Sequence, residues 1–122
     1  MSILAAVVRS TTPALSASVT PTTLSGETWG YGVCMTSSPA VVEALNGVPG
    51  YTYSWTRVSG STSITATSST SYSTYFQATM VAGTSVSAVF KCTVTDAASG
   101  TVDTANVSIT LTCNNPGGGI IP

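Results

Sequence analysis

The sequence contains no histidine and few charged residues. Three basic and four acidic residues make up 6% of its 122 residues, whereas charged residues make up about 25% of an ordinary soluble domain. Histidine is the side chain that most often acts as a general base or metal ligand near neutral pH. Its absence excludes most standard catalytic constellations.

The sequence also lacks a cationic cluster. Its three basic residues, Arg9, Arg57 and Lys91, are far apart, and its net charge is -1. Proteins that bind a phosphate backbone need clustered Lys and Arg, so we expect no nucleic-acid partner. No run approaches the about 20 apolar residues of a membrane helix, and the N-terminal segment lacks the features of an export signal. We therefore expect synthesis in a cytoplasm and no membrane anchor.

Metal-ligand clusters are absent as well. Cys34, Cys92 and Cys113 are dispersed and form no CxxC pair, which excludes a typical zinc site. The main interpretation is that they are buried, reduced thiols, with a bridge between Cys34 and Cys92 as the alternative and Cys113 free. Calcium between Asp96 and Asp103, which flank one predicted hairpin, is a weak alternative. We expect no metal and no cofactor.

A serine hydrolase would need Lys91 as its general base, because the chain has no histidine. This lysine alternates with apolar positions in a predicted strand, so we expect it to be protonated and to point to solvent. The chain is therefore expected not to be an enzyme.

Serine and threonine supply about a third of the chain, and nine aromatic residues are present. Threonine is β-branched, and both hydroxyl residues compete for backbone hydrogen bonds inside helices, so this composition favours strands. The apolar content is too high for a disordered chain.

Apolar and hydroxyl residues alternate with period two, which is typical of strands with one buried face. This alternation predicts strands near residues 15–19, 41–45, 51–57, 63–66, 72–80, 85–95 and 107–113. A glycine-containing segment (Gly26, Gly30 and Gly32) leads to Cys34, and we expect Trp29 and Tyr31 to lie in this connection. About seven short strands without helical periodicity predict an all-β antiparallel sandwich over residues 14–113, with an N-terminal arm (1–13) and a flexible C-terminal tail (114–122).

The inward positions of these strands define the predicted core. Its members are Tyr53, Trp55, Phe76, Phe90, Cys92, Val94, Val107, Ile109 and Leu111.

Three aromatic residues, Trp29, Tyr31 and Tyr75, are not assigned to the core. Aromatic rings at a surface can stack on sugar rings, so Trp29 and Tyr31 are candidates for contact with a glycan. The alternative is that they cover one end of the sandwich or an intersubunit contact.

Two segments, GVPGYTYSWTRVSG (47–60) and SAVFKCTVTDAASGTVDTANVSITLT (87–112), carry a family resemblance. They resemble the immunoglobulin-like and PKD-like β-sandwich modules of bacteriophage virion proteins and bacterial surface proteins. Trp55 and Cys92 correspond to the tryptophan and second cysteine of an immunoglobulin core, with Phe90 two residues before that cysteine. Cys34 lies earlier than the usual partner cysteine.

The resemblance implies a non-enzymatic virion structural protein made in the host cytoplasm, first of all a capsid decoration protein. A start at Met1 and a single domain favour the phage interpretation over a module of a long adhesin. The implied partners are capsid or tail subunits and copies of the chain itself. A tail or fibre component and a carbohydrate-binding adhesive module for a host glycan are the alternatives. The apolar residues expected to attach the chain through its ends are Ile3, Leu4, Val7, Val8, Ile120 and Ile121.

Overall fold

The computed structural model describes residues 13–30 and 32–114. It contains the strands β1 (Ser16–Thr20), β2 (Thr23–Trp29), β3 (Gly32–Met35), β4 (Ala40–Leu45), β5 (Thr52–Gly60), β6 (Thr65–Ala66), β7 (Ser73–Thr74), β8 (Phe76–Met80), β9 (Thr84–Thr95), β10 (Thr101–Asp103) and β11 (Val107–Asn114). These described residues include no helix long and apolar enough to span a membrane.

Each of four pairs of these elements is a single strand with an interruption: β1 with β2, β3 with β4, β7 with β8, and β10 with β11. Counted in this way, the fold has seven successive strands. One layer holds β1–β4–β7 and β3–β8–β6, so the second strand lies between the first and the fifth. The other layer holds β5, β9, β10 and β11, with β2 beside β11. This order is that of an immunoglobulin fold, and the predicted immunoglobulin-like β-sandwich is confirmed.

The first strand changes layer at Pro21. Before it, β1 is antiparallel to β4 as far as the pair Thr20 and Val41. Proline cannot donate to a ladder, and after it β2 runs parallel to β11, with Leu24 opposite Ile109. The expectation that Trp29 lies in a glycine-rich connection is therefore wrong, because Trp29 is the last residue of β2.

Glycine is required where β2 passes β3. The inward positions of β2 are Leu24 and Gly26, and a Cβ at Gly26 would overlap the carbonyl of Met35. The close approach is secured by a hydrogen bond from the Ser37 N–H to the Ser25 carbonyl at 3.0 Å.

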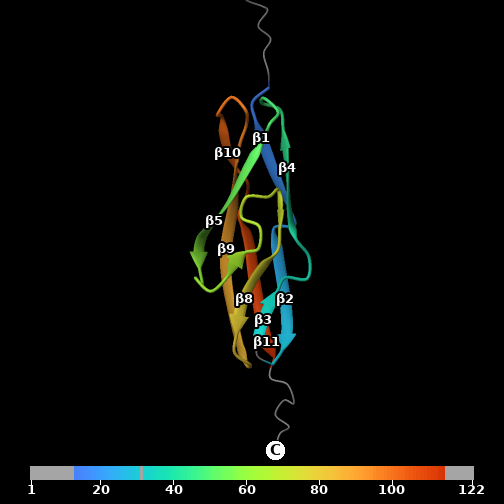
Figure 1. The fold of residues 1–122 in the computed structure, drawn as a ribbon, viewed down its shortest axis with the longest axis vertical. Helices are drawn as coiled ribbons and strands as arrows, with labels where there is room; N and C mark the ends of the chain where they lie inside the picture. Colours follow the sequence, from blue (N-terminus) through green and yellow to red (C-terminus); the bar gives the residue numbers. More distant parts are fainter. Residues whose placement is uncertain (1–12, 31, 115–122) are drawn as a thin grey trace, which may run out of the picture.

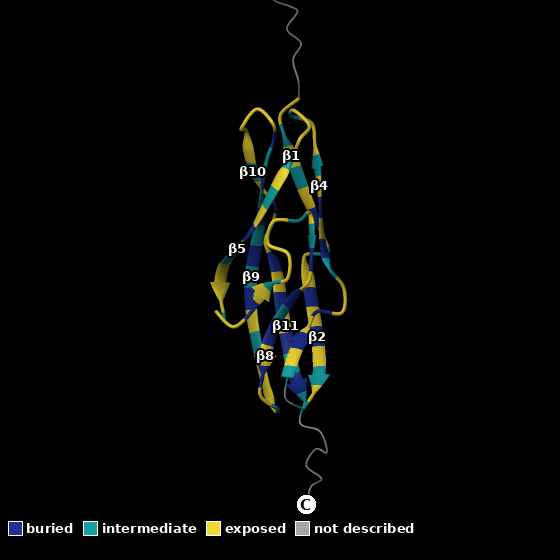
Figure 2. Cartoon of the chain, in the orientation of Figure 1, coloured by how far each residue is buried: buried dark blue, intermediate teal, exposed yellow. Residues whose placement is uncertain are grey.

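Aromatic rings fill the centre of the core. The ring centroid of Phe76 lies 5.6 Å from that of Trp55 and 4.8 Å from that of Phe90. The indole N–H of Trp55 donates to the Ser71 carbonyl at 2.8 Å, which satisfies a buried donor. Figure 2 shows the buried residues along the inside of the central strands.

The structure buries eight of the nine residues predicted for the core, namely Trp55, Phe76, Phe90, Cys92, Val94, Val107, Ile109 and Leu111. The ninth, Tyr53, is only partly buried. It lies in β5, at the margin of its layer, and its ring centroid is 6.2 Å from that of the exposed Tyr72.

The sandwich is elongated, and the described chain starts and ends at opposite poles (Figure 1). The N-terminal pole is formed by the start of β1 and by the β4–β5 and β9–β10 turns, where the Gly47 N–H donates to the Pro13 carbonyl at 3.2 Å. The C-terminal pole is formed by the ends of β2 and β11 and by the β2–β3 and β8–β9 turns. There the Gly30 N–H donates to the Asn114 carbonyl at 3.0 Å.

Candidate functional site

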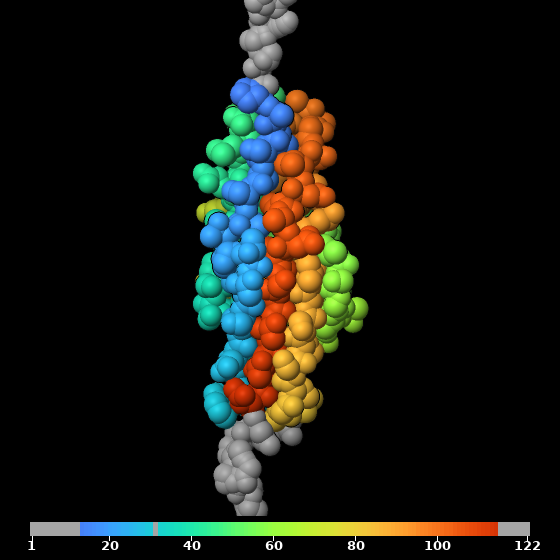
Figure 3. All heavy atoms as spheres, turned by 180° about the vertical axis from the view of Figure 1, so that it is seen from behind, coloured from blue at the N-terminus to red at the C-terminus, as the bar shows by residue number. Residues whose placement is uncertain are grey.

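One outer face of the sandwich is covered with hydroxyl groups. In Figure 3, β2, β11, β9 and β5 lie side by side on this face. The cross-strand pairs bring hydroxyl residues together in rows, since Thr110 lies opposite both Ser25 and Ser87, and Ser54 lies opposite Thr93. Alternation in the strands places these side chains outward, so the hydroxyl-rich face follows from the sequence pattern.

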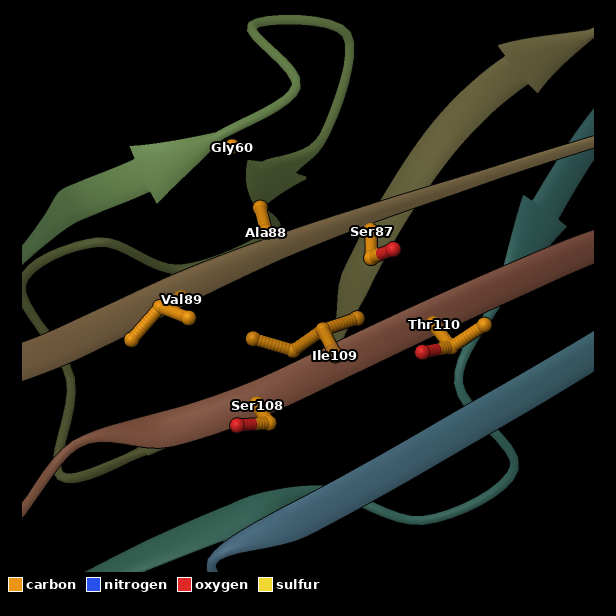
Figure 4. A pocket seen from close by; sticks show the side chains of 7 residues that line it. All are labelled: Gly60, Ser87, Ala88, Val89, Ser108, Ile109 and Thr110. Carbon is orange, nitrogen blue, oxygen red and sulfur yellow. The ribbon is translucent and has the colours of Figure 1, made fainter.

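A hollow of about 270 Å³ lies on this face where β5 ends beside β9 and β11. Its lining residues are Gly60, Ser87, Ala88, Val89, Ser108, Ile109 and Thr110. Figure 4 shows hydroxyl-bearing side chains from two strands and Gly60 beside Ala88. None of the lining residues is titratable, so the hollow has no group for acid–base chemistry.

Backbone geometry at the end of β5 produces the hollow. The register of β5 on β9 shifts between Arg57 and Ser59, and Gly60 follows with φ of 96°. A Cβ at Gly60 would lie 2.5 Å from the Cα of Ala88. Glycine is therefore needed at this close approach.

Lys91 is paired rather than free. Its ammonium donates to the Asp103 carboxylate at 2.8 Å, and Thr93 donates to the other carboxylate oxygen at 2.6 Å. The hydrogen bond from Lys91, with that from Thr93, lowers the pKa of Asp103 from its ordinary value. Lys91 lies on the outer face of β9, as expected, and its ammonium is held there in an exposed ion pair with Asp103.

Asp96 and Asp103 have separate roles. The Asp96 carboxylate accepts hydrogen bonds from the N–H groups of Val48, Ala98 and Gly100 at 2.8–3.0 Å. The bond from Val48, followed by that from Gly100, lowers the pKa of Asp96. Over residues 13–30 and 32–114, no three of the residues His, Cys, Asp and Glu gather as metal ligands. The Asp96 carboxylate therefore joins the β4–β5 and β9–β10 turns, and the Asp103 carboxylate forms the ion pair with Lys91.

The three cysteines are buried and unbridged. Cys34 lies in β3, with its Sγ 3.6 Å from the Thr112 carbonyl of β11, whereas Cys92 lies in β9 opposite Trp55. Burial raises the pKa of Cys34, and it raises the pKa of Cys92 to about 11. Both thiols are therefore protonated at neutral pH and poor nucleophiles.

Trp29, one of the two candidate glycan contacts, ends β2 at the C-terminal pole and is 67% exposed. Three aromatic pairs join described residues, and Trp29 belongs to none of them. The second candidate, Tyr31, lies outside the described residues. All six candidate attachment residues also lie outside them: Ile3, Leu4, Val7, Val8, Ile120 and Ile121.

Two exposed valines at the C-terminal pole were missed by the sequence reasoning. Val33 in β3 is 57% exposed, and Val81, directly after β8, is 58% exposed. With Trp29 they are the three most exposed large hydrophobic residues of the described chain. Trp29 points outward from the layer of β2 and β11, whereas the two valines point outward from the layer of β3 and β8. The outward position of Val33, between inward Gly32 and Cys34, is the sequence signal that could have revealed it.

Comparisons with known proteins give no family. No protein-family model matches the chain, and no curated protein matches it. Among solved structures, the PKD domain (329–428) of human KIAA0319 is similar at 14% identity and a TM-score of 0.36, over 81% of this chain and 83% of that one. The immunoglobulin-like fold is established by the strand pairing described above.

Proposed function

We propose that the chain is a non-enzymatic structural protein of a bacteriophage particle, first of all a capsid decoration protein, made in the host cytoplasm. The observation that carries this proposal is the scarcity of surface charge beside exposed apolar side chains. Seven of 122 residues are charged, while Trp29, Val33 and Val81 are each more than half exposed. A net charge away from zero protects a free monomer from association, whereas a subunit covered by neighbours has no such requirement.

The surroundings of the hollow, of Lys91 and of two cysteines support a non-enzymatic role. The hollow on the hydroxyl face has no titratable lining residue. Lys91 is held by Asp103, and burial raises the pKa of the Cys34 and Cys92 thiols. The hollow, Lys91 and these two thiols therefore offer neither an activated nucleophile nor a general base.

The positions of the chain ends support attachment through the termini. The described chain starts and ends at opposite poles (Figure 1). The apolar run ILAAVV lies in the segment before the N-terminal pole, and Ile120 and Ile121 lie in the segment after the C-terminal pole. Each segment can provide apolar anchors for a capsid subunit or for a neighbouring copy.

Incorporation into particles tests the proposal. One variant carries Ile3→Ser, Leu4→Ser, Val7→Ser and Val8→Ser, and a second carries Ile120→Ser and Ile121→Ser. We expect each to reduce the number of copies per particle, because a loss of more than about 1.4 kcal/mol of binding free energy weakens binding more than about tenfold. Quantitative mass spectrometry of purified particles measures the occupancy.

Val58→Ser is the matched control, since Val58 is an exposed valine of β5 away from both chain ends. Full occupancy after substitution of all six terminal residues would contradict attachment through the termini. Absence of the unmodified chain from every particle would contradict the virion role. Its location on capsid or tail would decide between a decoration protein and a tail or fibre component.

Trp29 favours one second candidate, an adhesive module for a host glycan. An exposed tryptophan can stack on a sugar ring, and Trp29 is 67% exposed. We expect Trp29→Ala to abolish binding on a glycan array without unfolding the chain if this candidate is correct. If the unmodified chain binds no glycan, the candidate is excluded.

A further inference from the structure

We infer that Cys34 and Cys113 form a disulfide bond across the sandwich when the reduced protein meets a disulfide oxidant such as oxidised glutathione. The bond joins β3 in one layer to β11 in the other, at the C-terminal pole. It replaces the alternative that the sequence left open, a bridge between Cys34 and Cys92. The bridge is a modification site of the fold and goes beyond the proposed function.

Cys34 and Cys92 lie at different heights of the sandwich. The Cys34 sulfur is 3.6 Å from the Thr112 carbonyl oxygen, and Thr112 lies opposite Ser85 of β9. The steps from the Cys34 Cα through Thr112 to the Ser85 Cα together span at most about 14 Å. Cys92 is seven residues beyond Ser85 in β9, which is about 23 Å at about 3.3 Å per residue. The two Cα atoms therefore stay further apart than the about 7 Å that a disulfide spans.

Cys113, by contrast, is within reach of Cys34. It directly follows Thr112 in β11. A carbonyl oxygen lies about 3 Å from the next Cα in a trans peptide, so the Cys34 sulfur lies within about 7 Å of the Cys113 Cα. Burial raises the pKa of Cys34, and the neighbouring Cys113 thiol raises this pKa further. A change of rotamer moves a cysteine sulfur by about 3 Å, so side-chain rotation brings the two sulfurs together.

Both side chains point into the space between the layers. Cys34 and Cys113 are each 1% exposed, and they belong to opposite layers. Cα atoms of β3 and β11 come within 8 Å of one another, whereas packed sheets are usually about 10 Å apart. Gly26 of β2 permits a close approach at this end, because a Cβ there would overlap the Met35 carbonyl of β3. One disulfide can therefore span the two layers.

In the reduced state each thiol contacts a backbone carbonyl. Cys34 donates to Thr112, and Cys113 contacts the Gly30 carbonyl in the β2–β3 turn. A thiol is a weak hydrogen-bond donor, so little is lost when the two contacts are exchanged for a covalent bond.

Oxidation proceeds by thiol–disulfide exchange. The thiolate of one cysteine attacks a sulfur of oxidised glutathione, which breaks the glutathione disulfide and releases one glutathione thiol. The second cysteine attacks the mixed disulfide and releases the other glutathione. The protein loses two electrons and two protons, and one glutathione disulfide gains them. Because both thiols are buried, the first step needs local opening of the pole, and we expect the bridge to form over hours.

The proposed function gives this reaction its occasion, and in this respect alone the inference rests on it. A reducing cytoplasm keeps thiols reduced, whereas release of particles from the host exposes them to an oxidising medium. The bridge then ties β11, which leads into the C-terminal segment, to the opposite layer.

Peptide mapping of the purified chain after incubation with oxidised glutathione tests the bridge. Cleavage after Arg57 and Lys91 and before Asp96 and Asp103 separates the three cysteines onto peptides 10–57, 92–95 and 103–122. We expect peptides 10–57 and 103–122 to be joined, with the mass of two hydrogen atoms lost. After unfolding, one alkylatable thiol should remain, on peptide 92–95. A parallel incubation in urea below the unfolding transition opens the pole and removes a kinetic barrier.

The melting temperature gives a second readout. A disulfide that closes a loop of about 80 residues restricts the unfolded chain, so oxidation should raise the melting temperature by about 10 °C or more. Dithiothreitol should reverse this rise. Cys34→Ala and Cys113→Ala should each abolish it, whereas the matched control Cys92→Ala should keep it.

Three alkylatable thiols after both incubations would overturn the inference, as would a joined pair that contains peptide 92–95 or two copies of one peptide. An oxidised chain with an unchanged melting temperature would overturn the assignment of the bridge to the folded state. These measurements use purified protein, so their failure leaves particle incorporation, the test of the proposed function, unaffected.

Discussion

The two poles of the sandwich differ in how their side chains are used. At the N-terminal pole, the buried carboxylate of Asp96 accepts hydrogen bonds from backbone N–H groups of both adjoining turns. The Tyr51 hydroxyl donates to the Asn46 carbonyl at 2.8 Å. At the C-terminal pole, Trp29 and Val81 are exposed to solvent. The N-terminal pole also exposes Leu45 and Val48, but among the described residues only this pole has a buried carboxylate that joins two turns.

This difference shows how a chain with few charges divides its tasks. Each polar contact at the N-terminal pole satisfies a backbone group, which stabilises the monomer. Exposed apolar side chains at either pole give the monomer no such benefit, since they gain free energy only when another surface covers them. Stability should therefore respond to substitution of Asp96 far more than to substitution of exposed apolar side chains, and the following predictions can break or sharpen this separation.

The largest effect is expected in the core that both poles share. Phe76 is fully buried between Trp55 and Phe90, so Phe76→Ala should lower the free energy of unfolding by about 3–5 kcal/mol. Urea denaturation measures this loss. Tyr75→Ala, at an exposed neighbour, is the control and should change it by less than about 0.5 kcal/mol.

A smaller effect is expected from Gly26→Ala. The added Cβ would overlap the Met35 carbonyl and push β2 away from β3, at a cost of about 1–3 kcal/mol. Hydrogen exchange of the Ser37 amide, which bonds to the Ser25 carbonyl, should quicken. Unchanged exchange and stability would show that the C-terminal half tolerates a wider gap between its layers.

Asp96 should make the stability of the N-terminal pole depend on pH. The N–H groups of Val48 and Gly100 lower the pKa of Asp96 from 3.8, so the folded state favours the ionised carboxylate. Its stabilising contribution is complete above pH 3.8 and is lost as the pH falls through the lower pKa of the folded state. Asp96→Ala should lower the melting temperature at neutral pH and flatten its decline in acid.

Glu43→Ala is the control for this pH dependence, because Glu43 is an exposed carboxylate on β4. Melting temperatures between pH 2 and pH 7 compare the two variants with the unmodified chain. Equal acid dependence in all three proteins would contradict the role assigned to Asp96.

The smallest effect on stability is expected at the C-terminal pole. Val33→Ser with Val81→Ser should change the free energy of unfolding by less than about 0.5 kcal/mol at each site, because both side chains are exposed. A large loss of stability would mean that these valines serve the monomer, and the contrast between the poles would fail.

The sequence predicted the strands whose buried faces carry regular apolar side chains. In β9 and β11 every inward position is apolar, for example Phe90 and Ile109, so period-two alternation is visible. β2 was missed because one of its two fully buried positions is Gly26. Its partner β11 is also distant in the chain and parallel to it, which local patterns do not reveal.

The candidate site was predictable only in part. Trp29 was identified because it had no place in the predicted core, and the structure exposes it. The exposure of Val81 depends on the register of β8 against β3, which the sequence does not specify. The hollow depends on the register shift in β5 and on Gly60, and a bulge of this kind has no unique sequence pattern.

A cryo-EM reconstruction of particles assembled with the unmodified chain tests the central claim most directly. We expect immunoglobulin-like density on the particle, with the segment before Pro13 or the segment after Asn114 in contact with a capsid subunit or a neighbouring copy. Particles without this density, from cells that produce the chain, would contradict the proposed role. Density whose two poles both face solvent would contradict the account of how the chain is attached.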